Sequence, residues 1–130
     1  MHQISIVTDD QALHPYLRDW ATAHLTPGGL FPQVDAPKDL RAFYYRLQAS
    51  PPDLAVVALP GVAGLNSAEH IRALCPDCAL IWCSDLDFSL QAYRLNAVYF
   101  ILGPPTEEEL NTGLTRWMEQ RETTLNRRVL

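Results

Sequence analysis

Apolar and polar residues follow two different patterns along this chain, and the two patterns alternate. Short continuous apolar runs, typical of strands that are covered on both faces of a sheet, occur five times. They are Ile4–Val7, Leu30–Val34, Leu54–Leu59, Ala79–Cys83 and Val98–Leu102. Between them, apolar residues recur at helical spacing, which predicts amphipathic helices. Strands that are each followed by a helix predict a parallel sheet with helices on both faces.

Breaking and capping residues mark the ends of the predicted helices. The helices are expected at Leu13–Leu25, Lys38–Gln48, Asn66–Leu74, Asp87–Leu95 and Thr106–Met118. We interpret PGVAG, residues 60–64, as a loop, so that Asn66 or Ser67 caps the third helix. Thr106 and Glu109 have the spacing of a capping box for the last helix. Because too few repeats are present for a closed barrel, an open, doubly wound sheet remains.

Composition and charge narrow the class of protein. A length of 130 residues suits one domain with a sizeable core, and a hydrophobic content of 48% indicates a globular chain. The formal net charge of -5 argues against binding to nucleic-acid phosphates, which needs a basic face. No apolar run approaches the roughly 20 residues of a membrane span, and the N-terminus lacks a signal-peptide pattern. Three cysteines, an odd number, favour a reduced, cytoplasmic protein.

Two short motifs resemble functional signatures without matching them. The C-x-x-C pair Cys75 and Cys78 closes a predicted helix, whereas a redox pair should open one, and a zinc site would need two further ligands. We therefore interpret these cysteines as structural thiols. GVAG at 61–64 lacks the glycine spacing and the lysine of a nucleotide-binding loop. No arrangement of serine, histidine and aspartate for nucleophilic catalysis can be placed on the strand ends.

Two adjacent acids, Asp9 and Asp10, follow the first strand. Ligands of open α/β sheets bind at the carboxyl ends of the strands, so these carboxylates could hold a metal ion there. Either could instead cap the first helix by accepting hydrogen bonds from its first backbone N–H groups. The spacing by itself favours the cap over the metal site.

The segment from Ile4 to about Met118 resembles the receiver domain of two-component response regulators. PPDLAVVALPGVAG is similar to the third strand and following loop of that family, and LIWCSDLDFSLQAYRLNAVYFILGPP to its fourth and fifth strands. The AYRLNAVYFIL portion is most similar to receivers that precede a LytTR-type DNA-binding domain. The resemblance implies a flavodoxin/CheY-like three-layer sandwich, an α/β fold with strand order 2-1-3-4-5. It also implies a domain over residues 1–120, with 121–130 as a helix end or a linker to an output domain.

Typical receivers transfer a phosphoryl group onto one of their own aspartates. In that family, acids after the first strand hold Mg²⁺ and the acceptor aspartate ends the third strand. The metal neutralises the phosphoryl oxygens while the carboxylate attacks. The acid pair corresponds to Asp9 and Asp10, or to Thr8 and Asp9 in the straight alignment. The acceptor position falls on Ala58, and no aspartate lies between Leu54 and Asp77 to replace it.

The remaining family positions are also altered. The hydroxyl position at the end of the fourth strand falls on Cys83, or on Ser84 with a shift of one residue. The lysine position falls on Gly103, although Pro104 after it is retained. The switch aromatic falls on Phe100, which lacks a hydroxyl group. These replacements leave no catalytic set for phosphoryl transfer.

The sequence thus predicts a degenerate receiver, or pseudo-receiver, that is not an enzyme and needs no cofactor, with at most a weak, vestigial Mg²⁺ site at Asp9 and Asp10. It is expected to act by binding a protein partner or a second copy, and to contact neither nucleic acid nor membrane itself. The expected face is the fourth helix, fifth strand and fifth helix. It includes Gln91, Arg94, Tyr99 and Arg116. The alternative is an enzyme or a small-ligand binder that uses the same sheet.

Overall fold

The computed structural model describes residues 3–26, 33–35 and 39–129 and contains a five-stranded parallel sheet. The strands are β1 (Gln3–Thr8), β2 (Gln33–Asp35), β3 (Leu54–Ala58), β4 (Ala79–Ser84) and β5 (Tyr99–Leu102). Their order in the sheet is β2-β1-β3-β4-β5. The expected α/β class with a parallel sheet is confirmed.

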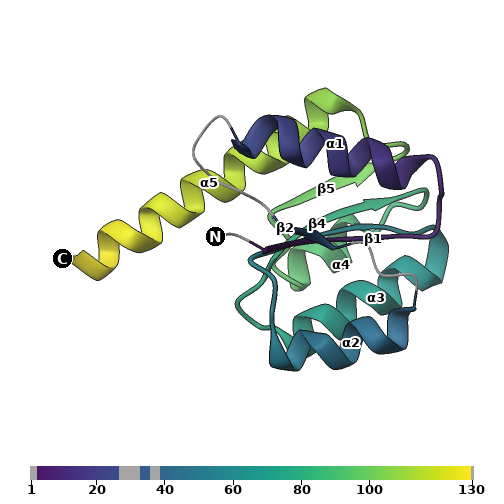
Figure 1. Ribbon diagram of the computed structural model, residues 1–130, viewed down its shortest axis with the longest axis horizontal. Coiled ribbons are helices and arrows are strands. Elements are labelled where there is room, and N and C mark those ends of the chain that lie inside the picture. The colour runs from purple at the N-terminus through teal and green to yellow at the C-terminus, as the bar shows by residue number, and fades with distance from the viewer. Residues whose placement is uncertain (1–2, 27–32, 36–38, 130) are drawn as a thin grey trace.

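Helices cover both faces of the sheet, as Figure 1 shows. One face carries α1 (Leu13–Leu25) and α5 (Glu107–Val129). The other carries α2 (Leu40–Ala49), α3 (Gly61–Leu74) and α4 (Ser89–Arg94). The far end of α5 extends past the body of the domain (Figure 1). None of the helices in the described part of the chain is long and apolar enough to cross a membrane.

The core has two apolar layers, one on each side of the sheet. All five residues of β3 are buried, as its unbroken apolar run predicts for the central strand. Leu17, Trp20, Ala21 and Leu25 form the buried stripe of α1, which confirms the helical spacing expected there. Burying the apolar faces of the helices against the sheet supplies the main favourable free energy of folding.

The third helix differs from its prediction. It begins at Gly61, so residues 60–64 are not a separate loop, and neither Asn66 nor Ser67 caps its start. Pro60, whose fixed φ suits the residue before a helix, stands at its N-cap in an extended conformation. The acceptor for the first N–H of the helix comes from Asp85, which follows a different strand. Local sequence rules could not find this cap, since they consider only neighbouring residues.

The other element starts differ by smaller amounts, whereas α5 continues to Val129, well past its expected end at Met118. α4 is shorter than expected, at Ser89–Arg94, and the Asp87 carboxylate accepts the N–H of Ser89 in a turn directly before it. β2 lies at Gln33–Asp35, and the first part of its expected range lies outside the described residues, as does the expected start of α2. Thr106 accepts a hydrogen bond from the N–H of Glu109, which is the first half of the predicted capping box.

Candidate functional site

The carboxyl ends of the strands surround an open cavity of about 270 Å³. Strand register brings Ala58 level with Thr8 on one side and with Cys83 on the other. The cavity is lined by Asp10, Leu13, Ala58, Leu59, Pro60, Cys83, Ser84, Asp85, Gly103, Pro104 and Pro105. Most of the positions singled out in the sequence therefore meet at one place. Asp9 and Phe100 are not among the residues that line it.

Asp10 caps the first helix. One oxygen of its carboxylate accepts hydrogen bonds from the N–H groups of Ala12 (2.9 Å) and Leu13 (3.2 Å). The expectation that one acid of the pair is a cap is therefore confirmed for Asp10. In the part of the chain that the structure describes, no three His, Cys, Asp or Glu residues gather as metal ligands.

The acceptor position contains a methyl group. Ala58 ends β3 and is 8% exposed, so it reaches the cavity but has no carboxylate to offer. The nearby acid is Asp85, whose Oδ1 accepts the N–H of Gly61 at 2.8 Å and lies 3.5 Å from Oγ of Ser84. Sequence reasoning missed Asp85. Its signal was an acid directly after the fourth strand, the same kind of signal that identified Asp9 and Asp10.

Cys83 and Ser84 take different roles at the end of β4. Cys83 is the register partner of Ala58 and is buried in the layer under α1 and α5. Burial, with a smaller contribution from the charge of Glu109, raises the pKa of the Cys83 thiol to about 12. Ser84 is also buried, and its hydroxyl accepts the N–H of Leu86. The hydroxyl thus holds the loop after β4, while the thiol belongs to the core.

Gly103 occupies a backbone conformation that suits glycine alone among common residues. Its φ is +98°, and its N–H donates to the carbonyl oxygen of Ser84 at 2.8 Å. A lysine here would strain the backbone, because side chains with a Cβ rarely adopt such a φ. The backbone at this position therefore favours glycine over lysine.

Phe100 is part of an aromatic cluster away from the cavity. The ring of Phe100 meets that of Trp82 edge-on, with centroids 5.4 Å apart. The ring of Phe88 stacks on that of Trp82, also with centroids 5.4 Å apart. Trp82 is completely buried. This packing holds the switch-aromatic position against the core on the side of α4.

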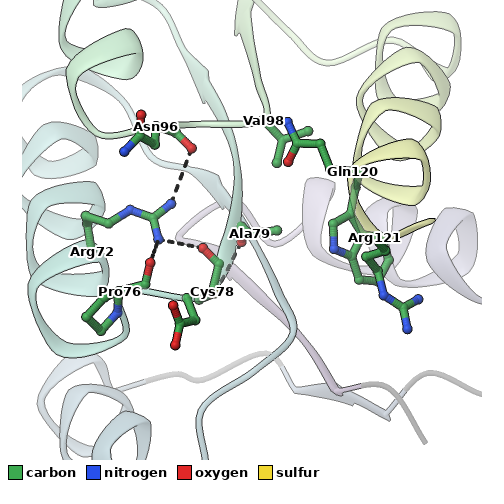
Figure 2. A pocket seen from close by; sticks show the side chains of 10 residues that line it. Arg72, Pro76, Cys78, Ala79, Asn96, Val98, Gln120 and Arg121 are labelled. Atoms are coloured by element: carbon green, nitrogen blue, oxygen red, sulfur yellow. Dashed lines mark hydrogen bonds between the residues drawn. The ribbon is translucent and has the colours of Figure 1, made fainter. Parts of the chain in front are cut away.

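The amino ends of the strands carry a second, larger cavity of about 420 Å³, drawn in Figure 2. Arg72 of α3 lines this cavity, and its guanidinium donates hydrogen bonds to backbone carbonyls of two loops. The acceptors are Cys75 (3.4 Å), Pro76 (2.7 Å), Cys78 (2.6 Å), Leu95 (2.7 Å) and Asn96 (3.4 Å). Figure 2 shows the bonds to Pro76, Cys78 and Asn96. This arrangement fastens the α3–β4 turn to the α4–β5 loop.

The C-x-x-C pair lies in that turn, after α3 and before β4 as expected. Both thiols are buried, and each is within hydrogen-bond distance of a backbone carbonyl. Desolvation raises the pKa of Cys75 and raises that of Cys78 to about 12. Both groups therefore stay protonated near neutral pH, which suits structural thiols rather than nucleophiles.

Comparisons with known proteins identify the fold. No family model matches the sequence, and no curated protein does. A CheY-like receiver domain protein from Methanospirillum hungatei JF-1 is similar in structure, with a TM-score of 0.72 at 19% identity over 95% of this chain and 98% of that one. The non-phosphorylated HemR receiver domain from Leptospira biflexa gives 0.66 at 21% identity, over 90% and 94% of the two chains. The BeF3-activated DrrB receiver domain gives 0.68 at 20% identity, over 92% and 98%. At such identities the likeness concerns the architecture, and the chain has the CheY-like fold of response regulator receiver domains.

Proposed function

We propose that this chain is a pseudo-receiver, a signalling domain that works by protein contacts and is not phosphorylated on aspartate. The observation that carries the proposal is Ala58, which stands at the end of β3 between Thr8 and Cys83. A methyl group cannot attack a phosphoryl donor, and Gly103 supplies no cation to stabilise a product. Members of a catalytic set act together, so the remaining acids do not compensate for these losses. A weak Mg²⁺ site at Asp9 and Asp10 would then be vestigial.

Incubation with acetyl phosphate and Mg²⁺ should leave the chain unmodified. We expect intact-mass spectrometry to show no gain of about 80 Da, the mass of one phosphoryl group. Magnesium with beryllofluoride should likewise leave the amide NMR spectrum unchanged. A conventional receiver with its acceptor aspartate, treated in parallel, controls for the donor. An acyl phosphate on Asp9, Asp10 or Asp85 would contradict the proposal.

The contact face we propose is formed by α4, β5 and α5. Four large apolar side chains on or beside α4 and β5 are exposed to solvent instead of packing in the core. They are Leu86 (49% exposed), Leu90 (56%), Tyr93 (80%) and Leu102 (55%). On the neighbouring α5, the guanidinium of Arg116 lies over the ring of Tyr99 at 4.9 Å. Exposed apolar side chains together with arginines, here Arg94 and Arg116, are the composition of a protein interface.

Self-association through this face can be tested with two matched tyrosines. Tyr93 on α4 and Tyr45 on α2 are each 80% exposed, so their replacement by serine changes surface chemistry equally. Sedimentation equilibrium should show dimers of the unaltered chain, and Tyr93→Ser should raise the dimer dissociation constant about tenfold. Tyr45→Ser should leave it unchanged. An unaltered chain that stays monomeric at high concentration would exclude the homodimer, and an equal effect of both variants would exclude this face.

We further propose that the domain is the N-terminal regulatory part of a LytTR-like transcription regulator. The resemblance of residues 92–102 to receivers of that class supports this assignment. The alternative, a small-ligand binder or enzyme, has less support. Ligands of such sheets bind at the carboxyl ends of the strands, and the cavity there, about 270 Å³, is smaller than the roughly 300–1,000 Å³ of common ligand pockets. The sequence that follows Leu130 in the gene would distinguish them. A basic, strand-rich segment is expected there.

A further inference from the structure

A carboxylate from one loop reaches across the end of the sheet to the start of a helix. Asp85 directly follows β4, and its Oδ1 accepts the backbone N–H of Gly61 at 2.8 Å. Gly61 is the first residue of α3, and the N-cap residue before it, Pro60, makes no side-chain cap. The cap of α3 is therefore a tertiary contact between residues 24 positions apart.

The charge of Asp85 suits this location. The N-terminus of a helix carries partial positive charge, which a carboxylate stabilises. Asp85 lines the same cavity as Ala58, whose methyl group supplies no charge at the end of β3. Asp85, which follows the adjacent strand β4, thus places a carboxylate in the cavity to which Ala58 contributes no charge.

The loop that carries Asp85 is also fixed from its other side. The hydroxyl of Ser84 accepts the N–H of Leu86 at 3.2 Å, and the carbonyl oxygen of Ser84 accepts the N–H of Gly103 at 2.8 Å. The loop is therefore tied to the start of α3 on one side and to the end of β5 on the other. Leu86, the residue after Asp85, belongs to the exposed apolar group on the proposed contact face.

We propose that Asp85 is a built-in anionic bridge that holds the β4–α4 loop, and with it Leu86, in one arrangement without any added phosphoryl group. Asp85 is a positioning residue in this account, because it acts through the loop and not by touching a ligand. A hydrogen bond from a backbone N–H to a carboxylate is about twice as strong as one to a neutral acceptor. The bridge itself does not rest on the proposed function, whereas its effect on binding does rest on the proposed contact face.

Hydrogen exchange and NMR on the full chain can test the bridge. In Asp85→Ala, the Gly61 amide should exchange about tenfold faster, since it loses a charge-assisted bond. Its proton resonance should also move, and amides of residues 86–90 should exchange faster. Asp85→Asn keeps an oxygen acceptor without the charge and should give an intermediate effect. Asp87→Ala is the matched control for the effect at Gly61, because Asp87 is an exposed acid of the same loop whose carboxylate accepts the nearby N–H of Ser89.

The outcomes separate the bridge from the contact face. Unchanged exchange at Gly61 and at residues 86–90 in Asp85→Ala would overturn the bridge. The bridge would also be overturned if Asp87→Ala sped up exchange of the Gly61 amide as strongly, because the effect would then come from the loss of any negative charge in the loop. Faster exchange at both segments in Asp85→Ala alone supports the bridge, whatever the oligomeric state. A loss of self-association in the same variant, measured alongside Tyr93→Ser, would extend it to the contact face.

Discussion

Gly64→Ala is expected to lower the free energy of unfolding by about 2 kcal/mol, although alanine is the better helix former. An added Cβ would overlap the backbone carbonyl oxygen of Leu59 and come within 3.3 Å of the buried Nε1 of Trp82. Backbone atoms cannot move aside as a flexible side chain can, so α3 would have to shift. We take about 3 kcal/mol for such overpacking and subtract the roughly 1 kcal/mol that alanine gains over glycine in a helix. Urea unfolding followed by circular dichroism would measure the change.

Gly113→Ala in α5 is the matched control. Its added Cβ would meet Cδ1 of Ile81 at 3.1 Å and Cβ of Tyr99 at 3.3 Å, but nothing as close as the Leu59 carbonyl oxygen lies to the Cβ added at position 64. The gain in helix propensity should then offset the tighter contact, and the change should stay within about 1 kcal/mol. If Gly64→Ala and Gly113→Ala destabilised the chain equally, the close contact of Gly64 in α3 with the carbonyl of Leu59 would be contradicted.

Arg72→Ala is expected to have the larger effect, a loss of about 3 kcal/mol in the free energy of unfolding. The guanidinium donates to carbonyls of the α3–β4 turn and of the α4–β5 loop, including those of Cys78 and Leu95. Removing it leaves several partly buried acceptors without their donor, which costs more than losing a single surface pair. Thermal or urea unfolding would measure the loss.

Arg72→Lys separates geometry from charge. A lysine keeps the positive charge, but its compact ammonium lacks the planar fork that reaches two loops at once, so most of the loss should remain. Arg41→Ala on the exposed side of α2 is the control and should change stability by no more than about 0.5 kcal/mol. Full stability in Arg72→Lys would show that charge alone holds the turn.

The two cavities have different roles in this picture. The one at the carboxyl ends contains Ala58 and Gly103, and its chemistry is capping and bridging by Asp10 and Asp85. The one at the amino ends is organised by Arg72 and by protonated, buried thiols, and serves to join loops. Neither arrangement depends on a phosphoryl group, which agrees with a domain that presents a fixed surface.

Much of the fold followed from the sequence because the relevant forces are local or periodic. The unbroken apolar run of β3 indicated a central strand, and the stripe of α1 indicated its buried face, since burial repeats with the period of each element. The position of Ala58 at a strand end also followed, because it depends only on where an apolar run stops. The capping role of Asp10 was accessible for the same reason, as a helix start and its cap are neighbours in the chain.

Other features depended on residues that meet only in the folded chain. The start of α3 was placed too late because its cap is Asp85, 24 residues further along. The need for glycine at position 64 comes from the Leu59 carbonyl and from Trp82 on another strand, not from the helix itself. In the sequence, Arg72 looks like any positively charged residue of a helix. Only the folded structure shows that it donates hydrogen bonds to the carbonyls of two loops. The sequence by itself determined where most strands and helices lie and which residues stand at the strand ends. The tertiary structure decided how separate loops are joined, because a hydrogen bond between residues far apart in the chain leaves no periodic pattern in the sequence.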